Sequence, residues 1–145
     1  MAGIIVGVDG SPGAVRALDW AMKEAAAHHA HLTVVAVHEV PISGWTGNPI
    51  ILGADVPELE KTRRAAEEAV SKAAARLGES RPASVTLHAA NGFPAEELIN
   101  ASRDADLLVV GSRGVGGFTR LMMGSVSSQV VHHAHCPVVI VPDKR

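Results

Sequence analysis

Short segments of strand length alternate with longer stretches of helical period along the whole chain, and this alternation constrains the fold more than any other feature of the sequence. Residues 4–8 read Ile-Ile-Val-Gly-Val, a continuous apolar run typical of a strand that is buried on both faces of a parallel sheet. Four later segments also predict strands, over residues 32–37, 84–90, 106–110 and 137–141. Parallel strands need long crossover connections, which the helical stretches supply. The sequence therefore predicts an α/β fold with a mainly parallel, five-stranded sheet and helices on both faces.

The stretches between these strands carry the signals of amphipathic helices. Ser11 offers an N-cap side chain, and Pro12 suits the first helical position. Apolar residues then recur at three- and four-residue spacing, which predicts a buried helix face formed by Val15, Leu18, Met22 and Ala25. We expect four helices, over residues 12–30, 57–77, 94–103 and 125–133, and a long loop over residues 38–56.

Length and composition limit the classes of protein to which the chain can belong. At 145 residues it is expected to form one domain, residues 1–145, because domains commonly run to about 100–200 residues. A net charge of −2 and only 3% aromatic residues argue against nucleic-acid binding, which favours basic surfaces and aromatic stacking platforms. No apolar run approaches the roughly 18 residues of a membrane span, and the first residues lack the basic region of a signal peptide. We therefore expect a cytoplasmic protein.

Two of the predicted strands lead into segments rich in glycine. These segments fall at the carboxyl ends of the strands, which is where open α/β sheets bind their ligands. The first strand leads into the segment Gly7-Val8-Asp9-Gly10-Ser11. The fourth strand leads into Gly111-Ser112-Arg113-Gly114-Val115-Gly116-Gly117, and Gly124-Ser125 follows at the start of a helix.

The second segment has the composition of an anion site. Glycines let backbone N–H groups approach a ligand closely, and a helix N-terminus adds unpaired N–H groups and the positive end of a dipole. Ser125 and Ser127 supply hydroxyl groups, and Arg113 and Arg120 lie nearby in the sequence. The pattern predicts a site for an anion, most simply a polyphosphate. The alternative is a flexible loop that Ser125 caps.

The role of Asp9 stays open between a ligand contact and a turn. The glycines around it have the wrong spacing for a dinucleotide fingerprint, and no lysine completes a Walker A loop in the second segment. A carboxylate at this position would repel a bare phosphate, but it is able to accept a ribose hydroxyl or to hold Mg²⁺ through water. Alternatively, Asp9 only forms the turn before the first helix.

The histidines and the cysteine are interpreted as structural. The string His-His-Ala-His occurs at residues 28–31 and again at 132–135, each time at the end of a predicted helix. Adjacent side chains on a helix point apart, so a metal cluster is the less favoured interpretation. The single cysteine, Cys136, excludes an intrachain disulfide and is expected to be a small buried residue.

The long glycine spacing resembles a known family. Gly111-x-x-Gly114, nine residues and then Gly124-Ser125 resemble the nucleotide-binding pattern of the ATP-binding branch of the universal stress protein family. Residues 7–11, 93–96 and 136–141 resemble that family's opening strand and turn, the start of its third helix and its final strand. The resemblance implies a three-layer Rossmann-like domain with the strand order 3-2-1-4-5, whose switch point lies between the first and fourth strands.

The resemblance also implies roles for individual residues. Asp9 would contact the ribose or the metal-bound phosphates, and the backbone of Val37 would meet the edge of the adenine. Gly111 and Gly114 would let the loop approach the ribose and phosphates, which Gly124, Ser125 and Ser127 would hold. A phosphate contact by Arg113 is our own inference, because this residue is often of another type in the family. The chain has no tyrosine, so we expect small aliphatic walls around the base.

We therefore expect an adenine-nucleotide-binding regulatory protein that takes ATP with Mg²⁺. No residue is suited to act as a general base toward the γ-phosphate, so an enzyme is not expected. The alternatives are an interaction protein of the same fold that binds no nucleotide, and a slow ATPase or nucleotide-transfer enzyme. The last strand is apolar throughout and is expected at a sheet edge, which predicts a homodimer through residues 137–141.

Overall fold

Five strands form one parallel sheet in the order β3-β2-β1-β4-β5. They are β1 (Ile4–Val8), β2 (His31–Glu39), β3 (Ser84–Gly92), β4 (Leu107–Gly111) and β5 (Val138–Val141). The computed structural model describes residues 3–39, 56–112 and 124–142. The predicted fold class, strand number and strand order are confirmed.

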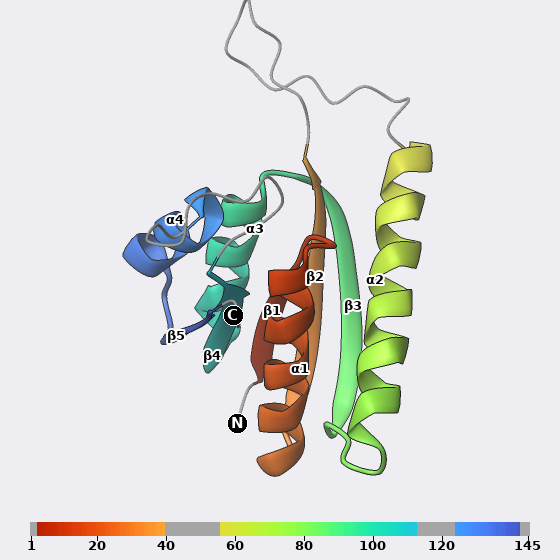
Figure 1. Ribbon diagram of the computed structural model, residues 1–145. Coiled ribbons are helices and arrows are strands. Elements are labelled where there is room, and N and C mark those ends of the chain that lie inside the picture. The colour runs from red at the N-terminus through yellow and green to blue at the C-terminus, as the bar shows by residue number, and fades with distance from the viewer. Residues whose placement is uncertain (1–2, 40–55, 113–123, 143–145) are drawn as a thin grey trace, which may run out of the picture.

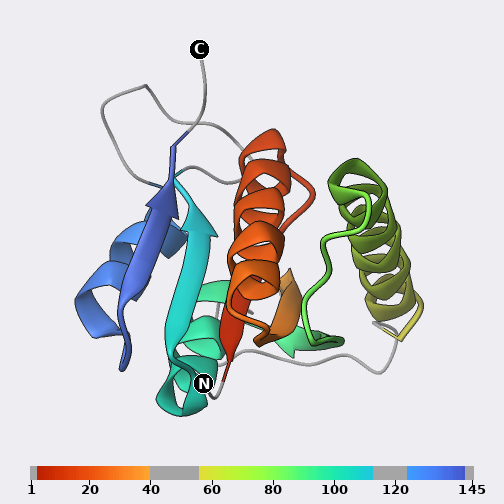
Figure 2. The same ribbon diagram turned by 90° about the horizontal axis from the view of Figure 1, so that it is seen from below.

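Helices cover both faces of this sheet. Within the described ranges they are α1 (Pro12–Ala27), α2 (Val56–Leu77), α3 (Pro94–Ala101) and α4 (Ser125–His133), with the short 3₁₀ helix η2 (Ser102–Asp104) after α3. In Figure 1, α1 and α2 lie on one side of the sheet, and α3 and α4 lie on the other. Figure 2 shows β4 (cyan) between β5 (blue) and β1 (red). The three-layer arrangement is thus as predicted.

No helix in the described part of the chain is long and apolar enough to cross a membrane.

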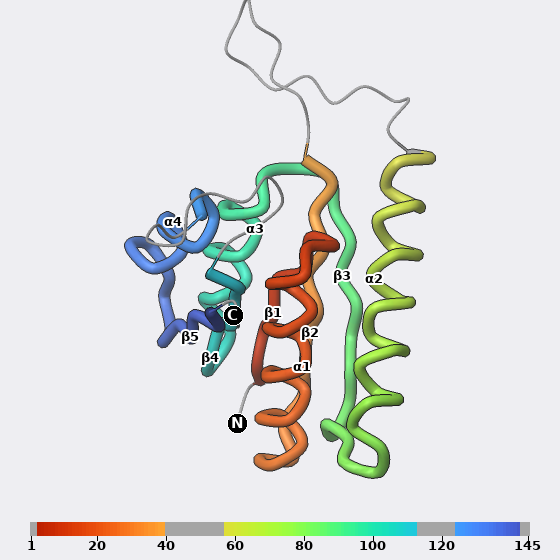
Figure 3. Tube along the Cα trace, in the orientation of Figure 1, coloured from red at the N-terminus to blue at the C-terminus, as the bar shows by residue number. Residues whose placement is uncertain are grey.

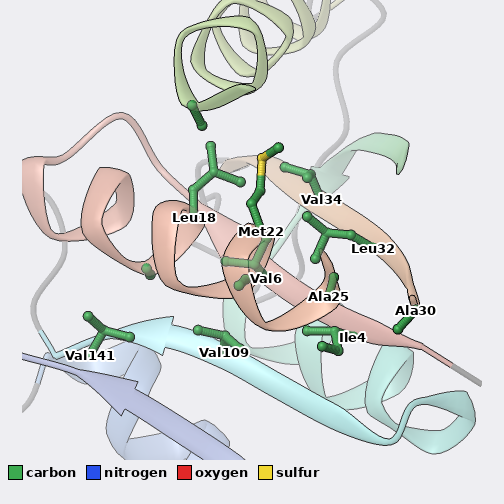
Figure 4. Packing of buried hydrophobic residues seen from close by; sticks show 13 residues of the cluster. Ile4, Val6, Leu18, Met22, Ala25, Ala30, Leu32, Val34, Val109 and Val141 are labelled. Atoms are coloured by element: carbon green, nitrogen blue, oxygen red, sulfur yellow. The ribbon is translucent and has the colours of Figure 1, made fainter. Parts of the chain in front are cut away.

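Each face of the sheet has its own hydrophobic core, because successive strand residues point to opposite faces. On the α1 side, Leu18 and Met22 pack toward the strand residues Val6, Leu32 and Val109 (Figure 4). The other core joins the helix residues Leu98 and Val130 to the strand residues Ile5, Val35, Leu108 and Val110. The two sets of strand residues alternate along β1, β2 and β4, which explains the continuous apolar runs in the sequence.

The start of α1 is as predicted, but its end and part of its buried face differ. The Ser11 side chain accepts a hydrogen bond from the Ala14 backbone N–H at 3.2 Å, and Pro12 begins the helix. Val15 was expected in the core but is 39% exposed, because the helix turns a stripe centred on Ala17, Leu18 and Ala21 toward the sheet. The prediction for Val15 is therefore wrong.

The helix ends at Ala27 and not at Ala30. His29 takes a positive φ of 50°, the left-handed conformation that commonly ends helices. The Ala30 N–H then donates to the Ala25 carbonyl at 2.8 Å, so the chain has already left the helical path. The predicted last turn of the helix, up to Ala30, is therefore a C-terminal cap.

Two strands reach further than their apolar runs, and one helix is shorter than expected. β2 and β3 pair through His38↔Asn91 and Glu39↔Gly92, two residues beyond the predicted ends of both strands. Residues 38 and 39 therefore belong to a strand and not to the predicted loop over residues 38–56. The last residue of that loop, Val56, begins α2, and residues 40–55 lie outside the described ranges. α3 ends at Ala101, and the residues to Asp104 form η2.

Candidate functional site

The sheet opens between β1 and β4 at their carboxyl ends. The β1–β4 ladder runs from Ile4↔Leu107 to Val6↔Val109, whereas β4 stays paired with β5 as far as Gly111↔Val141. The tube in Figure 3 shows β1 turning into α1 at the end of the sheet where β2 also ends. This is the point at which the strand order reverses, and in open α/β sheets ligands bind in the crevice formed there.

A cavity of about 420 Å³ lies at this end of the sheet, within the range of roughly 300–1,000 Å³ usual for small-molecule sites. Its walls come from the ends of β1, β2 and β4, from α2, and from the starts of α3 and α4. Among the described residues, the lining includes no aromatic, lysine, arginine or histidine side chain. Its carboxylates, within the same ranges, are Asp9 and Glu39.

The structure brings together all the predicted site residues that it describes. Asp9, Val37, Gly111, Gly124, Ser125 and Ser127 each line the cavity. The predicted residues Arg113 and Gly114, together with Arg120, lie outside the described ranges.

Asp9 forms the turn that connects β1 to α1. Its Oδ1 accepts hydrogen bonds from the Ser11 backbone N–H at 2.9 Å and from the Ser11 hydroxyl at 2.5 Å. Gly10 between them has a φ of +82°, a left-handed conformation that glycine adopts without strain. Asp9 thus forms the turn before α1, which was one of its two expected roles. It also lines the cavity, so a contact with a ligand stays compatible with this turn.

The N-terminus of α4 faces the cavity without a side-chain cap. Gly124 is the N-cap residue, and its N–H donates to the Ser112 carbonyl at 2.7 Å. The Ser128 N–H donates to the Gly124 carbonyl and closes the first helical turn, so the N–H groups of residues 125–127 precede any intrahelical acceptor. These donors and the positive end of the helix dipole favour an anion at this wall.

The two serines of this turn differ in burial and contacts. Ser125 is exposed. Ser127 is 2% exposed, and its hydroxyl donates to the Ser112 carbonyl at 3.1 Å and the Gly124 carbonyl at 3.0 Å. Ser127 therefore ties the first turn of α4 to the end of β4, while Ser125 presents its hydroxyl at the surface of the site.

Val37 marks the place where β2 loses one of its neighbours. The β1–β2 ladder ends at Val8↔Ala36, whereas the β2–β3 ladder continues through Val37↔Ala90 to Glu39↔Gly92. From Val37 onward, β2 thus pairs only on its β3 side within the described sheet. Val37 lines the cavity at this point.

The histidines and Cys136 lie outside the cavity lining. The His28 ring pairs with Glu24 at 2.9 Å at the end of α1, and the His31 ring nitrogen Nδ1 is hydrogen-bonded to the Ser84 hydroxyl. No group of three or more potential ligands in the described ranges is arranged to hold a metal. Cys136 was expected to be buried, but it is only half-buried, because it packs at the margin of the α3–α4 core. Desolvation raises the pKa of its thiol, and the charge of Asp106 raises it further.

Sequence reasoning missed the wall that α2 contributes. Thr62, Ala65, Ala66 and Ala69 line the cavity from this helix, and Glu39 lines it from β2. Threonine and alanine carry no recognisable binding motif, so only the packing of α2 against β2 and β3 identifies them. The one available signal is the run of small residues on that helix face.

Comparison with known proteins agrees with the fold. A profile of the Universal stress protein family matches residues 2–142. The chain belongs to the universal stress protein family. Among its relatives in that family, a universal stress protein of Thermus aquaticus is 39% identical over 140 residues, covering 95% of this chain and 96% of the relative.

Other universal stress proteins in the comparison differ in length or carry a ligand. A relative from Mycolicibacterium smegmatis is 36% identical over 139 residues, which are 96% of this chain but 47% of that protein. The chain thus spans about half the length of the first curated relatives that it matches. A solved universal stress protein in complex with cAMP is 25% identical, with a TM-score of 0.66 over 97% of this chain and 95% of that one.

Proposed function

We propose that residues 1–145 form one universal stress protein domain whose crevice between β1 and β4 binds an adenine nucleotide, with ATP and Mg²⁺ as its ligands. The observation that carries this proposal is that one cavity is lined both by the uncapped N-terminus of α4 and by the end of β2, which pairs there only with β3. The first suits phosphates and the second suits the edge of a base. A related universal stress protein in complex with cAMP supports an adenine nucleotide as the ligand.

The adenine lies at the β2 side of the cavity in this proposal. The Val37 backbone pairs with the edge of the base, and small α2 side chains such as Ala66 and Ala69 form its walls. No aromatic side chain lines this part of the described cavity, so the base is held by main-chain pairing and aliphatic contact without stacking.

The phosphates lie at the α4 side. The N–H groups that begin α4 and the hydroxyl of Ser125 donate to phosphate oxygens, while Ser127 holds the turn in place. A carboxylate next to a polyphosphate needs a cation between them. Asp9 fits a Mg²⁺ that keeps most of its ligands as phosphate oxygens and waters, since Mg²⁺ is usually bound through one or two carboxylates. The ion would neutralise phosphate charge.

We infer that the protein acts by binding and that a second copy pairs with its β5 edge. β5 has a neighbour in the described sheet only on the β4 side, and Val138, Val139 and Ile140 remain partly accessible there. An apolar edge strand is a template for pairing with another chain. Light scattering coupled to gel filtration measures this directly: a dimer is expected, and a monomer at all micromolar concentrations contradicts it.

Calorimetric titration of nucleotide-free protein tests the nucleotide proposal. The protein is unfolded, stripped of bound small molecules and refolded, and absorbance confirms that no nucleotide remains. ATP with Mg²⁺ is expected to bind with one site per chain, and GTP more weakly. No heat of binding up to millimolar ATP, in protein that keeps its helical circular-dichroism spectrum, overturns the proposal.

A further inference from the structure

We propose that Glu39 is a specificity-determining residue, whose carboxylate accepts a hydrogen bond from the exocyclic amine of the base and thereby favours adenine over guanine. This inference rests on the nucleotide-binding function proposed above, and it names a side chain that contacts the base. Asp9 and Glu39 are the carboxylates of the described cavity lining. Asp9 follows β1, on the side of the ribose and phosphates, whereas Glu39 ends β2, on the side where the base is placed.

Glu39 lies at the end of β2 that extends past β1. The β1–β2 ladder stops at Val8↔Ala36, and β2 continues to Glu39 beyond the turn that leads from β1 into α1 (Figure 3). Val37 and Glu39 both line the cavity. Residues two apart on a strand project to the same face and lie roughly 6.6 Å apart along it. The Glu39 side chain is therefore one strand repeat away from the backbone group that holds the base.

The other described residues on this side of the cavity offer little competition for the base. The α2 wall consists of small side chains, of which Thr62 alone carries a polar group, and the described lining includes no lysine, arginine or histidine that would neutralise a carboxylate within it. Glu39 is exposed, so its side chain is able to turn toward a ligand without displacing a packed neighbour. The described part of the cavity thus has a hydrogen-bond acceptor of negative charge beside the base.

Adenine and guanine differ in the group that such an acceptor meets. Adenine carries an amine at position 6, which has two N–H donors, and guanine carries a carbonyl oxygen there. One N–H of the amine is enough for a backbone carbonyl, so the second remains for Glu39. An ionised carboxylate only accepts hydrogen bonds. Beside guanine it would face a second acceptor with no proton between them, and a site built to bond one group rejects the analogue that lacks it.

The test compares three nucleotides on four proteins. ATP, GTP and purine riboside triphosphate, which lacks the amine, are titrated calorimetrically with Mg²⁺ into wild type, Glu39→Ala, Glu39→Gln and Glu97→Gln, each checked for its Tm. Glu97→Gln is the matched control. The Glu97 Oε1 lies 3.1 Å from where a Cβ on Gly92 would stand, and Gly92 is the register partner of Glu39, but Glu97 does not line the cavity.

The expected results are changes in the ratios of affinities. Wild type should bind ATP about tenfold more tightly than the purine analogue, the size of a hydrogen bond to a charged group. Glu39→Ala should lower this ratio at least threefold. Glu39→Gln should improve the affinity for GTP relative to ATP at least threefold, because its amide N–H is able to donate to the guanine oxygen. Glu97→Gln should leave both ratios as in wild type.

The ratios separate the specificity role from general effects of charge and folding. Loss of a negative charge strengthens the binding of all three triphosphates, and partial unfolding weakens all three, so neither changes a ratio. An unchanged ratio in Glu39→Ala, no relative gain of GTP in Glu39→Gln, or the same changes in Glu97→Gln overturns the role of Glu39 alone. A wild type that binds none of the three nucleotides overturns the nucleotide-binding function, and the role of Glu39 with it.

Discussion

The backbone of Gly111 lies directly against that of Gly13: a Cβ on Gly111 would stand 3.0 Å from both the carbonyl carbon and the carbonyl oxygen of Gly13. Gly111 ends β4, and Gly13 lies in the first turn of α1. The absence of a side chain at Gly111 is therefore needed for packing, whether or not a ligand is bound. This close approach holds the start of α1 next to the opening of the sheet.

Gly111→Ala is expected to lower the free energy of unfolding by about 1–3 kcal/mol, the usual cost of overpacking. The added methyl group meets backbone atoms, which cannot rotate away. Gly7→Ala is the control: its Cβ would meet Leu98 Cδ1 at 2.9 Å, and a side-chain end has more freedom to move. Urea unfolding of both variants measures the difference. Equal stability of Gly111→Ala and wild type contradicts the packing described for the two glycines.

Ser127→Ala is expected to destabilise the fold by about 1 kcal/mol, because it removes the hydroxyl that joins α4 to the end of β4. The loss stays moderate since the Ser112 and Gly124 carbonyls keep their backbone donors. Ser125→Ala, at an exposed position two residues away, is expected to keep the unfolding midpoint and to weaken ATP binding. The two roles are wrongly assigned if thermal unfolding shows the larger shift for Ser125→Ala.

Ala65→Phe is expected to weaken ATP binding at least tenfold without unfolding the protein. Ala65 is exposed and lines the cavity from α2, so a ring there occupies the space of the ligand without overpacking the core. Ala75→Phe, at another exposed position of the same helix outside the cavity lining, is the matched control and is expected to bind as wild type. Calorimetric titration gives both affinities, and equal binding by the two variants argues against the α2 wall.

Cys136 is expected to react slowly with iodoacetamide at neutral pH. Desolvation and the charge of Asp106 both raise the pKa of the thiol, so less thiolate is present at any given pH than in a free cysteine. The alkylation rate should therefore rise with pH through a midpoint above that of the urea-unfolded chain. Asp106→Asn, which keeps an acceptor for the Gly3 N–H, should lower the midpoint part of the way. A folded-state midpoint at or below the unfolded one contradicts this environment.

The strands and the carboxyl-end site were predictable because they depend on local composition. The apolar run at residues 4–8 predicts a strand because of burial, and the sequence Ser11-Pro12 predicts a helix start because of capping. The polar ends of β2 and β3 were not predictable in this way. His38 and Asn91 belong to the ladder because they pair with each other across β2 and β3, and neither residue type by itself predicts a strand.

Tertiary packing also decides the features of the site that sequence reasoning missed. Ala65 and Ala69 line the cavity only because α2 lies across β2 and β3, and the exposure of Val15 depends on how α1 is rotated about its axis. Ser127 could be singled out from the sequence as a hydroxyl near a helix start. Its burial and its bonds to the Ser112 and Gly124 carbonyls follow only from the approach of α4 to β4.

Mapping the ligand by backbone amide NMR tests the central proposal, that an adenine nucleotide occupies the crevice between β1 and β4, most directly. The amide signals of nucleotide-free protein are followed while ATP and Mg²⁺ are added. The largest shifts are expected at Asp9 and Gly10, at Val37 and at Ser125 and Val126, which belong to three separate segments that all line this cavity. Shifts concentrated elsewhere, such as on the β3 edge or the exposed face of α2, or no shifts at saturating ATP, would contradict it.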